Sequence, residues 1–151
     1  MSRIGLRFLP GDVARDRYLT DNHAAMAGPW FDEALVLGMQ PADLVTALGL
    51  DFRWPDGSHR FNAADLAVIR FEVTNPVLLA SVVSCCRLVS GELPVPAGRS
   101  WTGNGFAPAP RRAVPEYRLS AIPIPSGATL CEVTVSGQLN AVARRLGEHW
   151  A

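Results

Sequence analysis

Residues Val68–Thr74, VIRFEVT, alternate strictly between apolar and polar side chains. Successive side chains of a β-strand point to opposite faces, so this pattern predicts a strand with one buried face. The side chains expected inside are Ile69, Phe71 and Val73. Asn75-Pro76 follows directly and predicts the start of a helix. A strand that leads straight into a helix indicates that both kinds of element share one core.

The helix expected after Asn75-Pro76 ends near Gly91. At 100° per residue its apolar side chains form one broad stripe, made of Leu78, Leu79, Val82, Val83, Cys85, Cys86 and Val89. We expect this to be the main core helix, packed against the sheet. Adjacent helical residues point about 100° apart, so the two cysteines cannot grip one metal ion together. We interpret them as core residues.

The N-terminal half predicts one strand and three helices. Residues 3–9 alternate and are expected to form a short half-buried strand. Asp12 is a candidate N-cap for a helix that runs towards Met26. A second helix is expected from Trp30 to Met39, and a short third one begins after Gln40 with Pro41 at its first position. Residues 50–62 contain Pro55-Asp56-Gly57 and predict a β-hairpin.

The C-terminal part predicts two strands and a last helix. Residues 117–124 and 130–135 are expected to be strands joined by Pro125-Ser126-Gly127, with Cys131, Val133 and Val135 on one face. Ser136 is then a candidate cap for a helix that places Leu139, Val142, Leu146 and Trp150 on one side. Residues 92–115 show no periodic pattern.

These expected elements predict an α+β fold. They favour a mixed or antiparallel sheet with helices mainly on one face, and a ferredoxin-like variant fits if residues 3–9 supply its missing strand. A length of 151 residues suits a single domain over residues 1–151, and no repeat or linker divides the chain.

Composition narrows the function classes. Apolar residues make up 48%, charged residues 19%, and the formal net charge is zero, so a nucleic acid partner is not expected. All 14 basic residues are arginines, which excludes a Schiff-base lysine and a P-loop lysine. The absence of lysine is typical of a GC-rich bacterial genome.

Location is predicted from the cysteines and the apolar runs. Three cysteines do not make a secreted disulfide framework, and the N-terminus lacks the apolar run of a signal peptide. The longest apolar stretch, residues 76–86, is shorter than the about 20 residues that span a bilayer. We expect a cytoplasmic protein with no membrane partner.

The candidate binding segment is Gly98–Arg112, GRSWTGNGFAPAPRR. Its spacing matches no P-loop, dinucleotide fingerprint or nucleophile elbow. Residues 98–118 contain four arginines and one glutamate, a local charge of +3. Guanidinium groups beside aromatic rings suit recognition of carboxylates, phosphates or protein surfaces. The residues predicted to bind are Arg99, Trp101, Asn104, Phe106, Arg111 and Arg112.

The three histidines give little support for a metal-binding or catalytic role. His23, His59 and His149 have no metal-ligand spacing, so we expect neither a metal site nor a cofactor. We place His149 near the end of the last helix. Only His23, which follows Asp21 and Asn22, offers acid–base chemistry beside groups that could orient it. Catalytic residues are not identified from the sequence.

Three functions follow, in order of preference. The first is a small cytoplasmic accessory, adaptor or inhibitor-type module that binds another protein. The alternative is an enzyme or ligand-binding domain, in which Arg99 or Arg111 fixes a small anionic ligand, Trp101 stacks on it, and His23 or an aspartate moves protons. A nucleic acid accessory ranks third. The sequence leaves open whether the protein is an enzyme.

Overall fold

The computed structural model describes residues 3–36, 38–48, 50, 61–73, 106–107, 114–115 and 117–151. The helix predicted over residues 76–91, residues 51–60 of the hairpin predicted over residues 50–62, and most of the segment 92–115 lie outside these described residues. Within residues 92–115, a short antiparallel ladder joins β4 (Phe106–Ala107) to β5 (Val114–Pro115).

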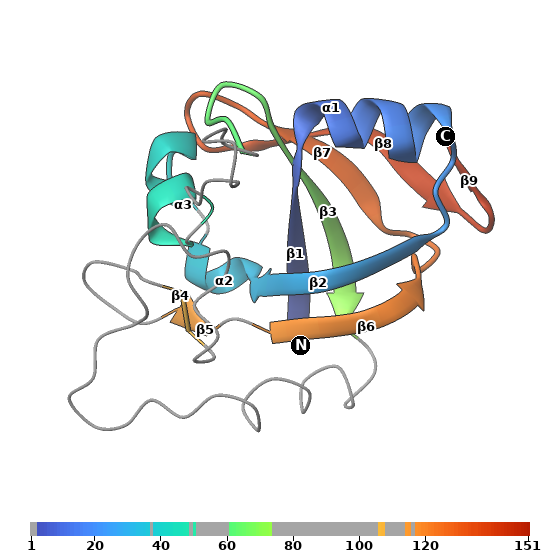
Figure 1. Cartoon of the computed structure of the whole chain (residues 1–151), viewed down its shortest axis with the longest axis horizontal. Helices are drawn as coiled ribbons and strands as arrows, with labels where there is room; N and C mark the ends of the chain where they lie inside the picture. Colours follow the sequence, from blue (N-terminus) through green and yellow to red (C-terminus); the bar gives the residue numbers. More distant parts are fainter. Residues whose placement is uncertain are drawn as a thin grey trace, which may run out of the picture.

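Seven strands of the described residues form one antiparallel sheet in the order β6-β2-β1-β3-β7-β8-β9 (Figure 1). Its centre is the pair β1 and β3, which is in register over eight residues. The strands are β1 (Arg3–Pro10), β2 (Ala25–Asp32), β3 (Leu66–Val73), β6 (Tyr117–Pro123), β7 (Thr129–Val133), β8 (Leu139–Leu146) and β9 (His149–Trp150). In Figure 1, β2 and β6 run across the direction of β1 and β3, so the sheet is strongly twisted.

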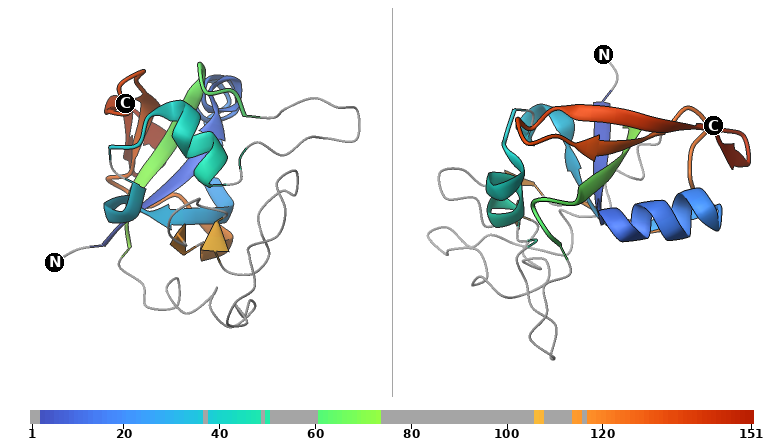
Figure 2. Two further views of the ribbon diagram at one scale, coloured as in Figure 1. Left: turned by 90° about the vertical axis from the view of Figure 1, so that its left-hand side faces the viewer. Right: turned by 90° about the horizontal axis from the view of Figure 1, so that it is seen from above.

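The helical segments lie at two places around the sheet. The first begins as α1 (Gly11–Val13) and continues as the π-helical segment η1 (Ala14–Thr20). The others are α2 (Glu33–Val36) and α3 (Pro41–Ala47), which lie together at the opposite end of the sheet from η1 (Figure 2). The α+β class and the antiparallel sheet are therefore confirmed. No helix in the described ranges combines the length and the apolar character needed to cross a bilayer.

Strand β3 separates two hydrophobic clusters. Ile69 and Phe71 are buried in the cluster that also holds Ala14 and Tyr18 of the first helical segment. Val68 is buried in the cluster that includes Leu44 of α3. The strand predicted from VIRFEVT is confirmed, including the buried face of Ile69 and Phe71. Its other face is also covered near Val68, because α3 packs there.

Gly5 of β1 permits close packing between side chains of β2 and β3. Trp30 and Phe71 meet edge to face, with ring centroids 5.6 Å apart. A Cβ at Gly5 would lie 2.5 Å from Cζ of Phe71 and 2.9 Å from Cε3 of Trp30. Both rings are buried, with at most 1% of their residue surface exposed. Only glycine leaves room for the two rings over β1.

The substitution Gly5→Ala tests this packing. Because the methyl group must displace a buried ring, we expect a loss of about 1–3 kcal/mol in the free energy of unfolding. The substitution Phe71→Leu should lower the free energy of unfolding less in the Gly5→Ala background than in the wild type, because the smaller side chain relieves the overlap with the added methyl group. Urea unfolding of the four proteins gives the coupling energy. An unchanged unfolding midpoint for Gly5→Ala would show that the rings are not held over this residue.

In the N-terminal half, the strand predicted over residues 3–9 is confirmed as β1, whereas the bounds of the first two predicted helices are wrong. The first helical segment begins at Gly11 and ends at Thr20, short of Met26, and Asn22 follows it with a φ of 50°. Residues Trp30 and Phe31, predicted to be helical, belong to β2 because β1 and β6 supply its hydrogen-bonding partners. Among the described residues of the predicted second helix, only residues 33–36 are helical. The short helix that begins at Pro41 is confirmed.

The predicted C-terminal helix is also wrong. Residues 117–123 and 129–133 form strands as expected, but residues 139–146 form β8, which pairs with β7. Ser136 lies in the β7–β8 turn instead of capping a helix, and Val135 is 91% exposed in that turn. His149 lies in strand β9. The ferredoxin-like variant depended on a helix after Ser136, where the structure has a strand.

A buried arginine connects the C-terminal hairpin to the end of η1. Arg145 of β8 is 3% exposed, and its guanidinium carbon lies 5.7 Å from the ring centroid of Trp150. Its Nη1 donates a hydrogen bond of 2.9 Å to Oδ1 of Asn22. Nδ2 of Asn22 donates in turn to the carbonyl of Glu148 at 2.9 Å. Asn22 therefore connects β8 with the β8–β9 turn and holds this hairpin at the end of the helical segment.

Candidate functional site

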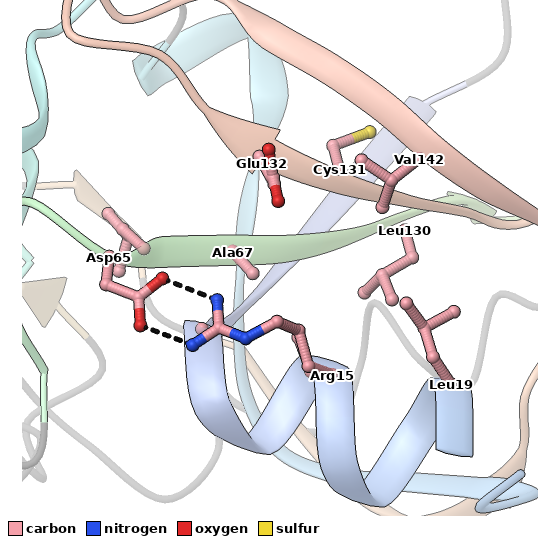
Figure 3. Close-up of a pocket in the computed structure, with 11 residues that line it drawn as sticks. Arg15, Leu19, Asp65, Ala67, Leu130, Cys131, Glu132 and Val142 are labelled. Carbon is pink, nitrogen blue, oxygen red and sulfur yellow. Dashed lines mark hydrogen bonds and ion pairs between the residues drawn. The ribbon is translucent and has the colours of Figure 1, made fainter.

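A groove lies between the first helical segment and the strands β3, β7 and β8 (Figure 3). It encloses a cavity of about 200 Å³. Its floor is apolar, and Figure 3 shows Leu19, Leu130 and Val142 pointing towards one another across it. Arg15, Asp65 and Glu132 also line it and bring charge to its sides. We call this cavity the η1–β8 groove.

The helical wall of the groove is wider than an α-helix. In η1 the amide of Asp21 donates to the carbonyl of Asp16, five residues earlier, at 3.0 Å. This hydrogen-bond spacing defines a π-helix, a form often found at functional sites. Ala14 and Tyr18 are buried against the sheet, and Ala14, Arg15 and Leu19 line the groove. Leu19 stays 36% exposed.

The strand wall contains a β-bulge. Leu130 pairs with Ala143, but Cys131 pairs with Ala141, so Val142 is an extra residue in β8. A bulge redirects the side chains of its strand, and such bulges occur often beside functional sites. Val142 lines the groove and remains 43% exposed. The bulge and η1 together expose two large apolar side chains at one groove.

The ion pair between Arg15 and Asp65 closes one end of the groove. Nη1 and Nη2 of Arg15 donate to the two carboxylate oxygens of Asp65 at 2.8 and 2.9 Å. The amide of Gly11 donates to the Asp65 carbonyl at 2.9 Å, and a Cβ at Gly11 would overlap the Asp65 carboxylate. A glycine at position 11 therefore allows β3 and the helix to approach closely enough for this pair.

The hydrogen bonds between Arg15 and Asp65 shift the pKa values of both side chains. The hydrogen bonds from Arg15 lower the pKa of Asp65, although partial desolvation opposes this shift. The same hydrogen bonds, followed by the charges of Asp65, Asp16 and Asp12, raise the pKa of Arg15. Asp65 therefore stays ionised to lower pH than an isolated aspartate.

Cys131 and His23 provide no reactive pair in the groove. Burial raises the pKa of the Cys131 thiol, so it remains protonated near neutral pH and is a weak nucleophile. His23 follows η1, contacts the edge of Tyr18 at 5.3 Å between centroids, and does not line the groove. Desolvation, followed by the charge of Arg17, lowers the pKa of His23. Among residues in the described ranges, no cluster of three or more histidines, cysteines or acids is arranged to bind a metal ion.

The groove differs from the site predicted from the sequence. Arg99, Trp101, Asn104, Arg111 and Arg112 lie outside the described residues, and Phe106 is described only as part of the backbone of β4. The binding role of these six residues stays a prediction. Sequence reasoning missed the groove because Val142 was assigned to a helix and because Arg15 and Asp65 are 50 residues apart.

Comparisons of this chain with known proteins found no relative. No protein family, curated protein or solved structure matches it. The fold is of the α+β class and is built on a twisted antiparallel sheet, with an apolar groove beside a π-helical segment.

Replacing Arg15 by Gln tests the ion pair. Because the hydrogen bonds to Asp65 are weakened, the pKa of Asp65 should rise towards its ordinary value. In the wild type the pair stabilises the fold above the ordinary carboxyl pKa, and this stabilisation is lost as pH falls through the lowered pKa. NMR titration of the Asp65 carboxyl carbon measures the shift. An Asp65 pKa that is the same in both proteins would contradict the pairing.

Proposed function

We propose that this chain is a non-enzymatic cytoplasmic module, of the accessory, adaptor or inhibitor type, that binds another protein. In this proposal an apolar side chain of the partner enters the η1–β8 groove. The observation that carries the proposal is the exposure of Leu19 and Val142 beside an apolar cavity of about 200 Å³. Covering such side chains removes apolar surface from water, which contributes about 25 cal/mol per Å².

The dimensions of the groove favour a side chain over a small-molecule substrate. Small-molecule pockets usually enclose about 300–1,000 Å³. The groove is smaller than this range and is open between the helix and the strands. Of the two carboxylates that line it, Asp65 is engaged by Arg15, and the Cys131 thiol has a raised pKa. These properties support a binding role more than acid–base or nucleophilic catalysis.

The arginine-rich segment Gly98–Arg112 is proposed as a second contact with the partner. Its support is its sequence, which combines Arg99, Arg111 and Arg112 with Trp101 and Phe106. The cytoplasmic location is supported by the cysteine content and by the free, buried state of Cys131. The two candidate contacts can be separated by mutation because they use different residues.

The groove is tested by the double substitution Leu19→Ser with Val142→Ser. Both side chains are partly exposed, so the variant should fold, but it should lose at least about tenfold in partner recovery because the apolar anchor site is gone. The matched control is Val135→Ser with Leu146→Ser. Those side chains are 91% and 53% exposed but do not line the groove.

The measurement is quantitative co-purification from host cells, with thermal unfolding of each variant as a check on folding. The proposal predicts that the groove variant loses partners that the control variant keeps. Equal recovery by both variants would exclude the groove. If Arg111→Ala with Arg112→Ala then lost the same partners, the contact would belong to the segment Gly98–Arg112 instead.

A further inference from the structure

Strand β8 has an unpaired backbone edge beside the η1–β8 groove. In the sheet order β8 is followed by β9, which has two residues. The ladder between them extends to Arg144 of β8, which exchanges both backbone hydrogen bonds with Ala151 at 2.8 and 2.9 Å. Within the part of the chain that the structure describes, no residue pairs with the side of residues 139–141 that faces away from β7. An unpaired edge can accept another strand.

The register of β7 with β8 shows which backbone groups point to this edge. The amide of Thr134 donates to the carbonyl of Gln138 at 2.8 Å, so Gln138 directs its carbonyl towards β7. The same register continues without a shift as far as Ala141. Alternate residues of an antiparallel strand direct their N–H and C=O groups to opposite sides. The N–H and C=O groups of Leu139 and Ala141 therefore point away from β7, whereas those of Asn140 point towards it.

The groove lies next to this edge. Glu132 of β7 and Val142 of β8 both line the groove, and Asn140 is paired with Glu132 (Figure 3). Directly paired residues have their side chains on the same face of a sheet, with Cβ atoms about 4.5–5.5 Å apart. In a strand added to β8, the residue opposite Asn140 would thus place its side chain on the groove face, beside Val142. Asn140, Ala141 and Val142 are exposed.

We infer that the occupant of the groove is a short extended segment of another protein, which adds to β8 as an antiparallel strand. Its backbone exchanges hydrogen bonds with Leu139 and Ala141. The side chain between the two pairing residues is apolar and enters the groove beside Val142. This inference rests on the proposed function and adds the kind of segment that the partner presents. In this mode of recognition the main-chain hydrogen bonds give affinity, and the side chain in the pocket gives specificity.

The length of the edge favours a short segment over a second copy of this chain. The bulge at Val142 and the pairing of Arg144 with Ala151 limit the edge on one side, and the turn at residues 134–138 limits it on the other. The regular edge between these limits is residues 139–141. An antiparallel β8 from a second copy would bring its own β7–β8 turn against the bulge and β9. A short segment meets no such obstruction.

The test is an NMR titration of the whole chain with capped peptides of the sequence Gly-Ser-Thr-Val-Thr-Ser-Gly. The two threonines are expected to pair with Leu139 and Ala141, and the valine to enter the groove. The amide resonances of Leu139 and Ala141 and the methyl resonances of Leu19 and Val142 should therefore shift. A peptide with serine in place of the valine should bind at least about tenfold more weakly, because the apolar anchor is lost.

Methylation of the peptide nitrogens tests the backbone pairing. When both threonine nitrogens are methylated, the two N–H donors that point to β8 are lost, and the affinity should fall at least about tenfold. The matched control is methylated at the valine and at the serine that follows the second threonine. These nitrogens point away from β8, so the control should bind like the parent peptide. A contact through side chains alone would not distinguish the two methylated peptides.

A variant of the chain tests the same hydrogen bonds from the other side. Ala141→Pro removes the N–H that points to the edge, and proline is tolerated on the edge strands of sheets. The affinity for the parent peptide should fall about threefold to tenfold, as expected for one lost hydrogen bond. Ala141→Ser keeps the N–H and should bind like the wild type. If thermal unfolding shows that Ala141→Pro does not fold, the methylated peptides decide.

Three outcomes would overturn the inference. If the two methylated peptides bind equally, the backbone pairing is wrong, although the apolar anchor site stands. If the parent peptide shifts none of these resonances up to about 1 mM, strand addition is wrong, and the co-purification of the Leu19→Ser, Val142→Ser variant still judges the proposed function. If the amide resonances of Leu139 and Ala141 shift with the concentration of the chain alone, the occupant is a second copy and not a different protein.

Discussion

The edge-to-face contact of Trp30 with Phe71 over Gly5 is the constraint on which the rest of the fold depends. Trp30 comes from β2, Phe71 from β3, and Gly5 from the strand between them. The contact fixes three neighbouring strands in one register, because a shift by one residue would place a Cβ under the rings. It also fills the cluster against which the first helical segment packs.

The groove follows from that arrangement. Once β1 is fixed, Pro10 and Gly11 lead directly into the helix, and the Gly11 amide is bonded to Asp65 at the start of β3. Ala14 and Tyr18 then enter the cluster that Trp30 and Phe71 help to build. The remaining side of the helix faces β7 and β8. Asn22 and Arg145 hold the segment that follows η1 against the β8–β9 hairpin.

The sequence predicts correctly the elements whose signals lie within a few residues. It predicts the wrong secondary structure where pairing with a neighbouring strand determines it. VIRFEVT and the short helix after Pro41 were recognised because alternation and helix-start signals are contained within a few residues. Trp30 was assigned to a helix because an apolar run fits a buried helix as well as a buried strand. Residues 139–150 contain Leu139, Val142 and Leu146 at helical spacing, but the partner strand β7 overrides that spacing.

The candidate groove could not be predicted for the same reason. Val142 reaches it through a bulge that exists only in the pairing of β7 with β8, and Leu19 through the wider turn of a π-helix. Neither feature has a sequence signature. The ion pair of Arg15 and Asp65 joins residues 50 positions apart, so only the folded chain brings them together.

Hydroxyl-radical footprinting of the chain with and without its co-purified partner tests the central claim most directly, because it reports the solvent access of individual side chains. The account predicts that Leu19 and Val142 become protected in the complex, whereas Val135 and Leu146 are oxidised at the same rate as in the free chain. A complex in which Leu19 and Val142 remain as reactive as before would contradict the assignment of the η1–β8 groove as the binding site.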